Sequence, residues 1–84
     1  MYIVIYESPA STDLDGTVFR SKKKALEKFH QTWDGIEILD PENVEILEDE
    51  EDYKVLFYYD GSYGYTVTFK KFELGETFNL IGIG

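Results

Sequence analysis

Two strand-like runs, residues 53–59 and 65–71, constrain the fold of this chain more than any other feature of its sequence. In the second run large apolar residues alternate with threonine and lysine, which is the period of two expected for a strand whose two faces meet different surroundings. Asp60, Gly61 and Gly64 lie between the runs and supply the residues that tight turns favour. The pattern therefore predicts a β-hairpin. One face of its second strand would carry Tyr65, Val67 and Phe69.

The first twenty residues predict two further strands. Residues 2–6 are β-branched or aromatic with no polar alternation, which is typical of a central strand buried on both faces. Residues 8–16 contain the usual turn formers and predict a loop. Residues 17–20 then predict a short strand that pairs back on the first.

Residues 22 to about 33 have the pattern of an amphipathic helix. Ser21 precedes them and predicts an N-cap, because its hydroxyl can accept a hydrogen bond from a free amide of the first turn. Gly35 follows and predicts a left-handed C-terminal cap. Three lysines in the first turn oppose the helix dipole, so we expect an acidic neighbour, for which residues 40–52 are the obvious candidate. The apolar face comprises Ala25, Leu26, Phe29 and Trp33.

Residues 40–52 form an acidic run in which eight of thirteen side chains are carboxylates. Asp40 and Pro41 could open a helix, with Asp as the cap and Pro at the first position. The β-branched residues that follow favour a brief strand around 44–48 instead, with a turn of carboxylates at 49–52.

Together these elements predict one domain of the α+β class, in which a single helix packs on a mostly antiparallel sheet in the order β-β-α-β-β-β. With 84 residues the chain is near the size at which one core just suffices. Fourteen aromatic side chains supply much of the apolar area, since each removes about 150–250 Å² from water when buried. The apolar residues within 72–83 fit a last short strand or an apolar tail.

Charge is distributed unevenly along the chain. Residues 1–33 carry a net charge of +1, residues 34–53 carry −10 and residues 54–84 balance at zero, which sum to −9. Such a protein is a poor ligand for nucleic acid or for an anionic membrane, because both are bound through Lys and Arg. There is no cysteine, so there is no disulfide or thiolate metal site. We expect a cytoplasmic protein.

The sequence Asp13-Leu-Asp-Gly-Thr17 resembles the D-x-D-G-T motif of haloacid-dehalogenase-type phosphatases. The resemblance implies Asp13 as a nucleophile and Asp15 as a general acid, in a Rossmann-like domain with a further acidic pair for Mg²⁺. That chemistry requires the first Asp to follow a buried parallel strand directly, whereas residues 7–13 follow the first predicted strand here. We therefore predict a turn at this motif and no catalytic residue.

Two other residue groups are candidates for chemistry. His30 is the only histidine, and its place beside the core position Phe29 predicts a solvent-facing helix residue. Residues 49–52 offer carboxylates to a hard cation but lack the spacing and the glycine of a calcium loop. We predict no metal site and no other cofactor.

We expect the acidic run to be the functional surface. Its carboxylates repel one another and outnumber the lysines of the chain, so a basic partner would relieve the repulsion. In size, acidity and lack of catalytic residues the chain is similar to small phage-encoded inhibitors of host nucleic-acid proteins, uracil-glycosylase inhibitors and anti-restriction or anti-CRISPR proteins among them. The resemblance implies a non-enzymatic inhibitor that mimics DNA and binds a basic nucleic-acid-binding protein.

Ten residues are predicted as partner contacts. The acidic ones are Glu42, Glu45, Glu48, Asp49, Glu50, Glu51 and Asp52. Tyr58, Tyr59 and Tyr63 are secondary, because tyrosine is enriched at interfaces and adjacent strand residues point to opposite faces. Cross-strand packing of these tyrosines and a merely solvated acidic turn are the alternatives. A structural or assembly role is the other alternative, as a homodimer formed through the Tyr-rich hairpin or residues 78–83.

Overall fold

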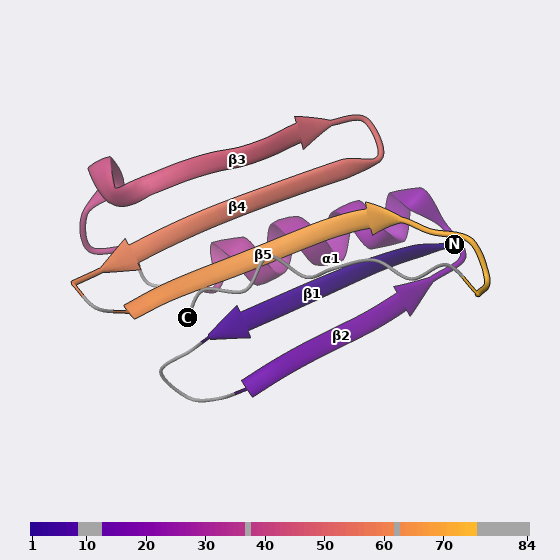
Figure 1. Cartoon of the computed structure of the whole chain (residues 1–84), viewed down its shortest axis with the longest axis horizontal. Helices are drawn as coiled ribbons and strands as arrows, with labels where there is room; N and C mark the ends of the chain where they lie inside the picture. Colours follow the sequence, from indigo (N-terminus) through magenta and orange to yellow (C-terminus); the bar gives the residue numbers. More distant parts are fainter. Residues whose placement is uncertain (9–12, 37, 62, 76–84) are drawn as a thin grey trace.

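A computed structural model of the chain has one helix lying across one face of a five-stranded antiparallel sheet (Figure 1). The structure describes residues 1–8, 13–36, 38–61 and 63–75. A single-turn 3₁₀ helix, η1 (Pro41–Asn43), precedes the third strand. The predicted class and the order β-β-α-β-β-β are confirmed. The elements are β1 (Tyr2–Ser8), β2 (Asp13–Phe19), α1 (Lys22–Asp34), β3 (Val44–Glu50), β4 (Tyr53–Asp60) and β5 (Tyr63–Lys71).

The strands are arranged in the order β2-β1-β5-β4-β3, and every neighbouring pair is antiparallel. The sheet therefore joins an N-terminal hairpin, β1–β2, to a C-terminal meander, β3–β4–β5, through the pairing of β1 with β5. The chain passes from β2 at one edge to β3 at the other, and α1 lies on that path across the sheet (Figure 1). β1 is an interior strand, as predicted, with Val4 and Ile5 both buried.

The main core lies between α1 and the sheet. Ala25 and Phe29 of α1 pack against Val4, Val67 and Phe69. Phe29 is 2% exposed, and its ring centroid lies 6.4 Å from that of Phe69. The predicted period of two in β5 is confirmed, and the structure shows that its apolar face is the one that meets the helix. The buried residues of the opposite sheet face include Ile5, Val55, Thr66 and Thr68.

The helix begins as predicted but its C-terminal cap differs. The Ser21 hydroxyl accepts a hydrogen bond from the Lys24 amide at 3.3 Å. Gly35 has a φ of −77° and is right-handed, so the predicted left-handed cap is wrong. Its amide instead donates to the Gln31 carbonyl at 3.0 Å, which continues the helical pattern for one more residue.

Two boundaries were predicted wrongly for the same physical reason. β2 begins at Asp13, within the predicted loop, and pairs with β1 from Ser8–Asp13 to Tyr2–Phe19. β3 extends to Glu50, and only Glu51 and Asp52 form the turn. In both cases a neighbouring strand supplies backbone hydrogen bonds to residues of low intrinsic strand preference, and this pairing outweighs the preference.

The described helix is too short and too polar to cross a membrane. The predicted last strand or apolar tail falls mostly on residues 76–84, outside the described residues.

Candidate functional site: an acidic sheet edge

Eight carboxylates line β3 and its two ends, and we call this set, the Asp and Glu residues of 40–52, the acidic edge. β3 is the last strand of the sheet, so its outer side pairs with no other strand among the described residues. At the start of the edge, the Asp40 carboxylate caps η1. Its Oδ1 accepts a hydrogen bond from the Glu42 backbone amide, with 3.1 Å between nitrogen and oxygen. At its end, Glu51 and Asp52 form the turn into β4. The predicted order of a strand followed by a carboxylate turn is confirmed, although the strand takes up the first two residues of the predicted turn.

The register of β3 distributes its carboxylates over both faces of the edge. Glu45, Glu48 and Glu50 lie opposite Phe57, Val55 and Tyr53, all on the sheet face that turns away from α1. Asp49 lies opposite Lys54. The register shifts between Ile46 and Glu48, where one extra residue bulges from the strand. Bulges twist an edge strand and hinder its pairing with another sheet.

Two lysines of the chain pair with three of these carboxylates. Lys22 Nζ lies 3.2 Å from Glu51 Oε1 and 3.1 Å from Asp52 Oδ1. Lys54 Nζ lies 2.8 Å from Asp49 Oδ1. Hydrogen bonding to Asp52 raises the pKa of Lys22, and the neighbouring Glu51 adds to the effect. The expected meeting of a first-turn lysine with the acidic run is therefore confirmed for Lys22.

The remaining carboxylates of the acidic edge make no ion pair within the described part of the chain. Eight carboxylates less two lysines leave a net charge of −6 on the edge. The pKa of Tyr53 is raised, first by burial of its side chain and then by the negative charges of Glu48 and Glu50. The unpaired carboxylates are Asp40, Glu42, Glu45, Glu48 and Glu50.

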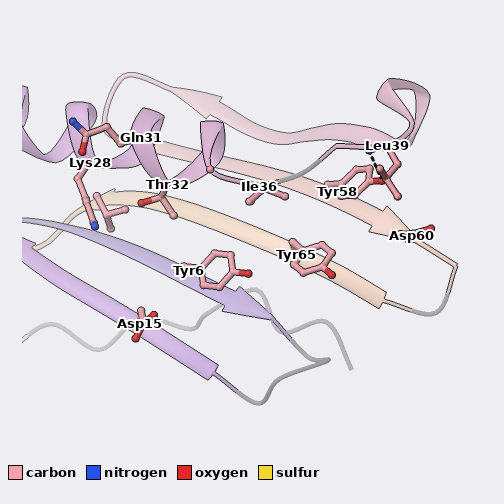
Figure 2. A pocket seen from close by; sticks show the side chains of 12 residues that line it. Tyr6, Asp15, Lys28, Gln31, Thr32, Ile36, Leu39, Tyr58, Asp60 and Tyr65 are labelled. Atoms are coloured by element: carbon pink, nitrogen blue, oxygen red, sulfur yellow. Dashed lines mark hydrogen bonds between the residues drawn. The ribbon is translucent and has the colours of Figure 1, made fainter.

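The structure separates the three tyrosines predicted as secondary contacts. Tyr58 is 1% exposed, and its hydroxyl accepts from the Leu39 amide at 3.1 Å (Figure 2). It is a core residue and cannot touch a partner, so that prediction is wrong. Tyr59 is half-buried on the opposite face, where its ring stacks at 5.7 Å on Phe57. Tyr63 is the first residue of β5 and lies opposite Asp60 in the register.

The residues that resemble a phosphatase motif lie in a different context from that motif. Asp13 to Thr17 belong to β2, which is an edge strand antiparallel to β1, and Asp15 is exposed in the middle of it. The predicted turn is wrong, and the buried parallel strand that the motif requires is not present among the described residues. His30 is exposed on α1 as predicted, with its ring 5.4 Å from that of Phe29. The described residues contain no group of three or more His, Asp or Glu side chains arranged to hold a metal ion.

Sequence reasoning missed a cavity of about 520 Å³ between the C-terminal half of α1 and the sheet (Figure 2). Its walls come from the helix, from the segment that follows it and from strands at widely separated places in the chain. No local pattern links these residues, so only the three-dimensional arrangement reveals them.

Comparison of the chain with protein-family models, with curated proteins and with solved structures finds no match.

Proposed function

We propose that this chain is a non-enzymatic binding protein that presents the acidic edge to a basic, nucleic-acid-binding protein, and that it inhibits that protein by occupying its DNA site. The observation that carries the proposal is the gathering of eight carboxylates on one sheet edge with only two lysines paired to them. A cytoplasmic setting, where such partners meet their nucleic acid, is part of the proposal.

The linear charge density of β3 supports a DNA mimic. From Glu45 to Glu50 the strand spans about 17 Å at the usual rise per residue. Four carboxylates lie within that length. One strand of duplex DNA carries one phosphate per roughly 3.4 Å of axis. The four carboxylates are spaced by about 5–6 Å on average, so the edge offers a basic groove a line of anions about three-fifths as dense as one phosphate backbone. Association would be fast and sensitive to salt.

Apolar side chains among the carboxylates support a protein partner. Ile46 is 65% exposed and Leu47 is 38% exposed, both in the middle of β3. Interfaces bind chiefly through a few apolar anchors that are surrounded by polar contacts. With Tyr58 buried, these two residues are the apolar anchors that accompany the acidic contacts.

A homodimer through the Tyr-rich hairpin is not supported. β4 pairs with both β3 and β5, and β5 pairs with both β4 and β1, so neither hairpin strand has a free edge. Two copies would repel each other across β3, because like charges would be juxtaposed there. Pairing through residues 78–83 stays a prediction, since that segment lies outside the described residues. Sedimentation at two concentrations tests it, and one monomeric mass at both would refute it.

A matched pair of charge variants tests the proposed function. Glu45→Gln/Glu50→Gln removes two unpaired carboxylates of the acidic edge, whereas Glu27→Gln/Asp34→Asn removes two exposed carboxylates of α1. Both double variants have a net charge of −7, which is −9 plus two. The immobilised proteins are exposed to the heparin-retained fraction of a lysate at about 50 mM and about 0.5 M salt, with duplex DNA as a competitor.

We expect the immobilised protein to capture a basic protein at low salt, and duplex DNA to prevent this capture. The α1 double variant should still capture that protein, whereas the β3 double variant should not. Capture that is insensitive to salt and to DNA would contradict the proposal. So would an equal loss in both variants, because net charge rather than the placed carboxylates would then be responsible.

A further inference from the structure

We infer that the cavity beneath the C-terminal half of α1 is a binding site for a small organic cation with a planar aromatic body. The cavity has a volume of about 520 Å³, within the range of about 300–1,000 Å³ that is usual for small-molecule sites. It involves none of the residues of the acidic edge, so it does not depend on the proposed function.

The floor and roof of the cavity suit a flat apolar body. The rings of Tyr6 and Tyr65 lie on the sheet, and Ile36 and Thr32 lie above them (Figure 2). The Tyr65 ring stacks at 6.0 Å on Tyr58, which holds it in place. The faces of aromatic rings carry partial negative charge, so they attract both aromatic edges and cations.

The charged groups of the cavity favour a positive ligand. Lys28 descends from α1 at the same end as Asp15, whereas Asp60 lies alone at the other end (Figure 2). Two carboxylates and one ammonium line the cavity, so its charged groups sum to −1, and Asp60 is the charged lining residue at its end of the cavity. Neither Asp15 nor Asp60 makes an ion pair within the described residues.

The end of the helix adds to the negative potential. Gly35, at the C-terminal end of α1, lines the cavity, and no basic residue stands in the last turn of the helix. The C-terminus of a helix carries roughly half a negative charge on its free carbonyls and attracts cations. We therefore place the ammonium of the ligand toward Asp60 and its aromatic body over Tyr65 and Tyr6.

Three indole compounds of similar shape test the inference. Tryptamine carries an ammonium on a two-carbon tail, tryptophol a neutral hydroxyl and indole-3-propionate a carboxylate. Each is titrated into the ¹⁵N-labelled protein, and amide shifts are followed for residues that line the cavity. We expect saturable shifts with tryptamine and an affinity about fivefold higher than for tryptophol, because one partly exposed ion pair contributes about that factor.

Three variants locate the binding. Asp60→Asn should abolish the preference for tryptamine over tryptophol, whereas Glu27→Gln, which removes the same charge from an exposed helix residue that does not line the cavity, should preserve it. Glu45→Gln/Glu50→Gln should also preserve it, which separates the cavity from non-specific attraction to the acidic edge. Equal affinity for the three compounds, tighter binding of indole-3-propionate, shifts confined to β3, or no saturation by about 10 mM would each overturn the inference.

Discussion

Replacing Tyr58 by Phe removes one hydrogen bond from the segment that joins α1 to β3. The Tyr58 hydroxyl accepts from the Leu39 amide at 3.1 Å, and the Tyr58 side chain is otherwise enclosed at 1% exposure. A hydrogen bond of this kind contributes about 0.5–1.5 kcal/mol to stability, and an amide left without any partner would cost more. Leu39 is 69% exposed, so water can approach its amide in the variant. We therefore expect the free energy of unfolding to fall by about 1 kcal/mol.

For a chain of 84 residues, the entropy of unfolding is about 0.18 kcal/mol/K, so the loss corresponds to a melting temperature lower by about 6 °C. Circular dichroism during heating measures this shift. Tyr59→Phe is the matched control, because Tyr59 lies on the opposite face and its hydroxyl makes no hydrogen bond within the described residues. The control should change stability by less than about 0.5 kcal/mol.

Hydrogen exchange adds a local measurement to the thermal one. The Leu39 amide should exchange faster in Tyr58→Phe and at an unchanged rate in Tyr59→Phe. Equal melting temperatures for the two variants would refute the reasoning, as would an unchanged Leu39 exchange rate. Binding at the acidic edge should survive Tyr58→Phe, because Tyr58 is buried and lies on β4 rather than on the acidic edge.

Three further perturbations have directions fixed by the structure. Burial raises the pKa of Glu7 above 4.5, and its buried Oε2 has no hydrogen-bond partner among the described residues. Stability is therefore lost as the pH rises from the unfolded pKa through the folded pKa. Glu7→Gln should accordingly match the natural protein in urea unfolding at acid pH below the unfolded pKa. At pH 7 it should be more stable by a few tenths of a kcal/mol, because solvent screens the partly exposed carboxylate. A constant difference at all pH values would contradict this. Glu50→Gln should lower the pKa of Tyr53, because it removes one of the two charges that raise it. The tyrosine ¹³Cζ shift during alkaline titration measures this pKa. An unchanged pKa would show that the carboxylates of the acidic edge do not act on Tyr53. Phe29→Ala should cost about 3–5 kcal/mol in urea unfolding, since Phe29 is a fully enclosed core residue; a loss below about 1 kcal/mol would mean that the helix does not pack as described.

Local patterns were sufficient to predict the elements of this fold. The alternation in β5 predicted that Tyr65, Val67 and Phe69 share one face, and Ser21 marked the start of the helix. Both signals act over a few residues, so the sequence carries them directly. The charge of the first helical turn even indicated a contact across the molecule, because an uncompensated Lys22 needs an acidic partner.

Features that depend on distant partners could not be predicted. The residues around Asp15 have the composition of a turn, but they form a strand because they pair with β1. Adjacent tyrosines on β4 had to face opposite ways, yet only the packed sheet shows that Tyr58 is the buried one. The residues that line the cavity, such as Tyr6, Lys28 and Asp60, come from separate elements. Their proximity therefore cannot be recognised from any short stretch of the sequence.

The pairing of β1 with β5 also determines when the sheet can close during synthesis on the ribosome. β1 and β2 are made first, but the neighbour that completes β1 begins only at Tyr63. Between the end of β2 at Phe19 and the start of β5 at Tyr63, the nascent hairpin waits roughly 2–9 s at usual rates of about 5–20 residues per second. Throughout this interval Val4 and Ile5 lack the cover of β5, and one side of β1 is open to any extended chain. Until β5 is made, the β1–β2 hairpin therefore has an edge on which mispairing can begin.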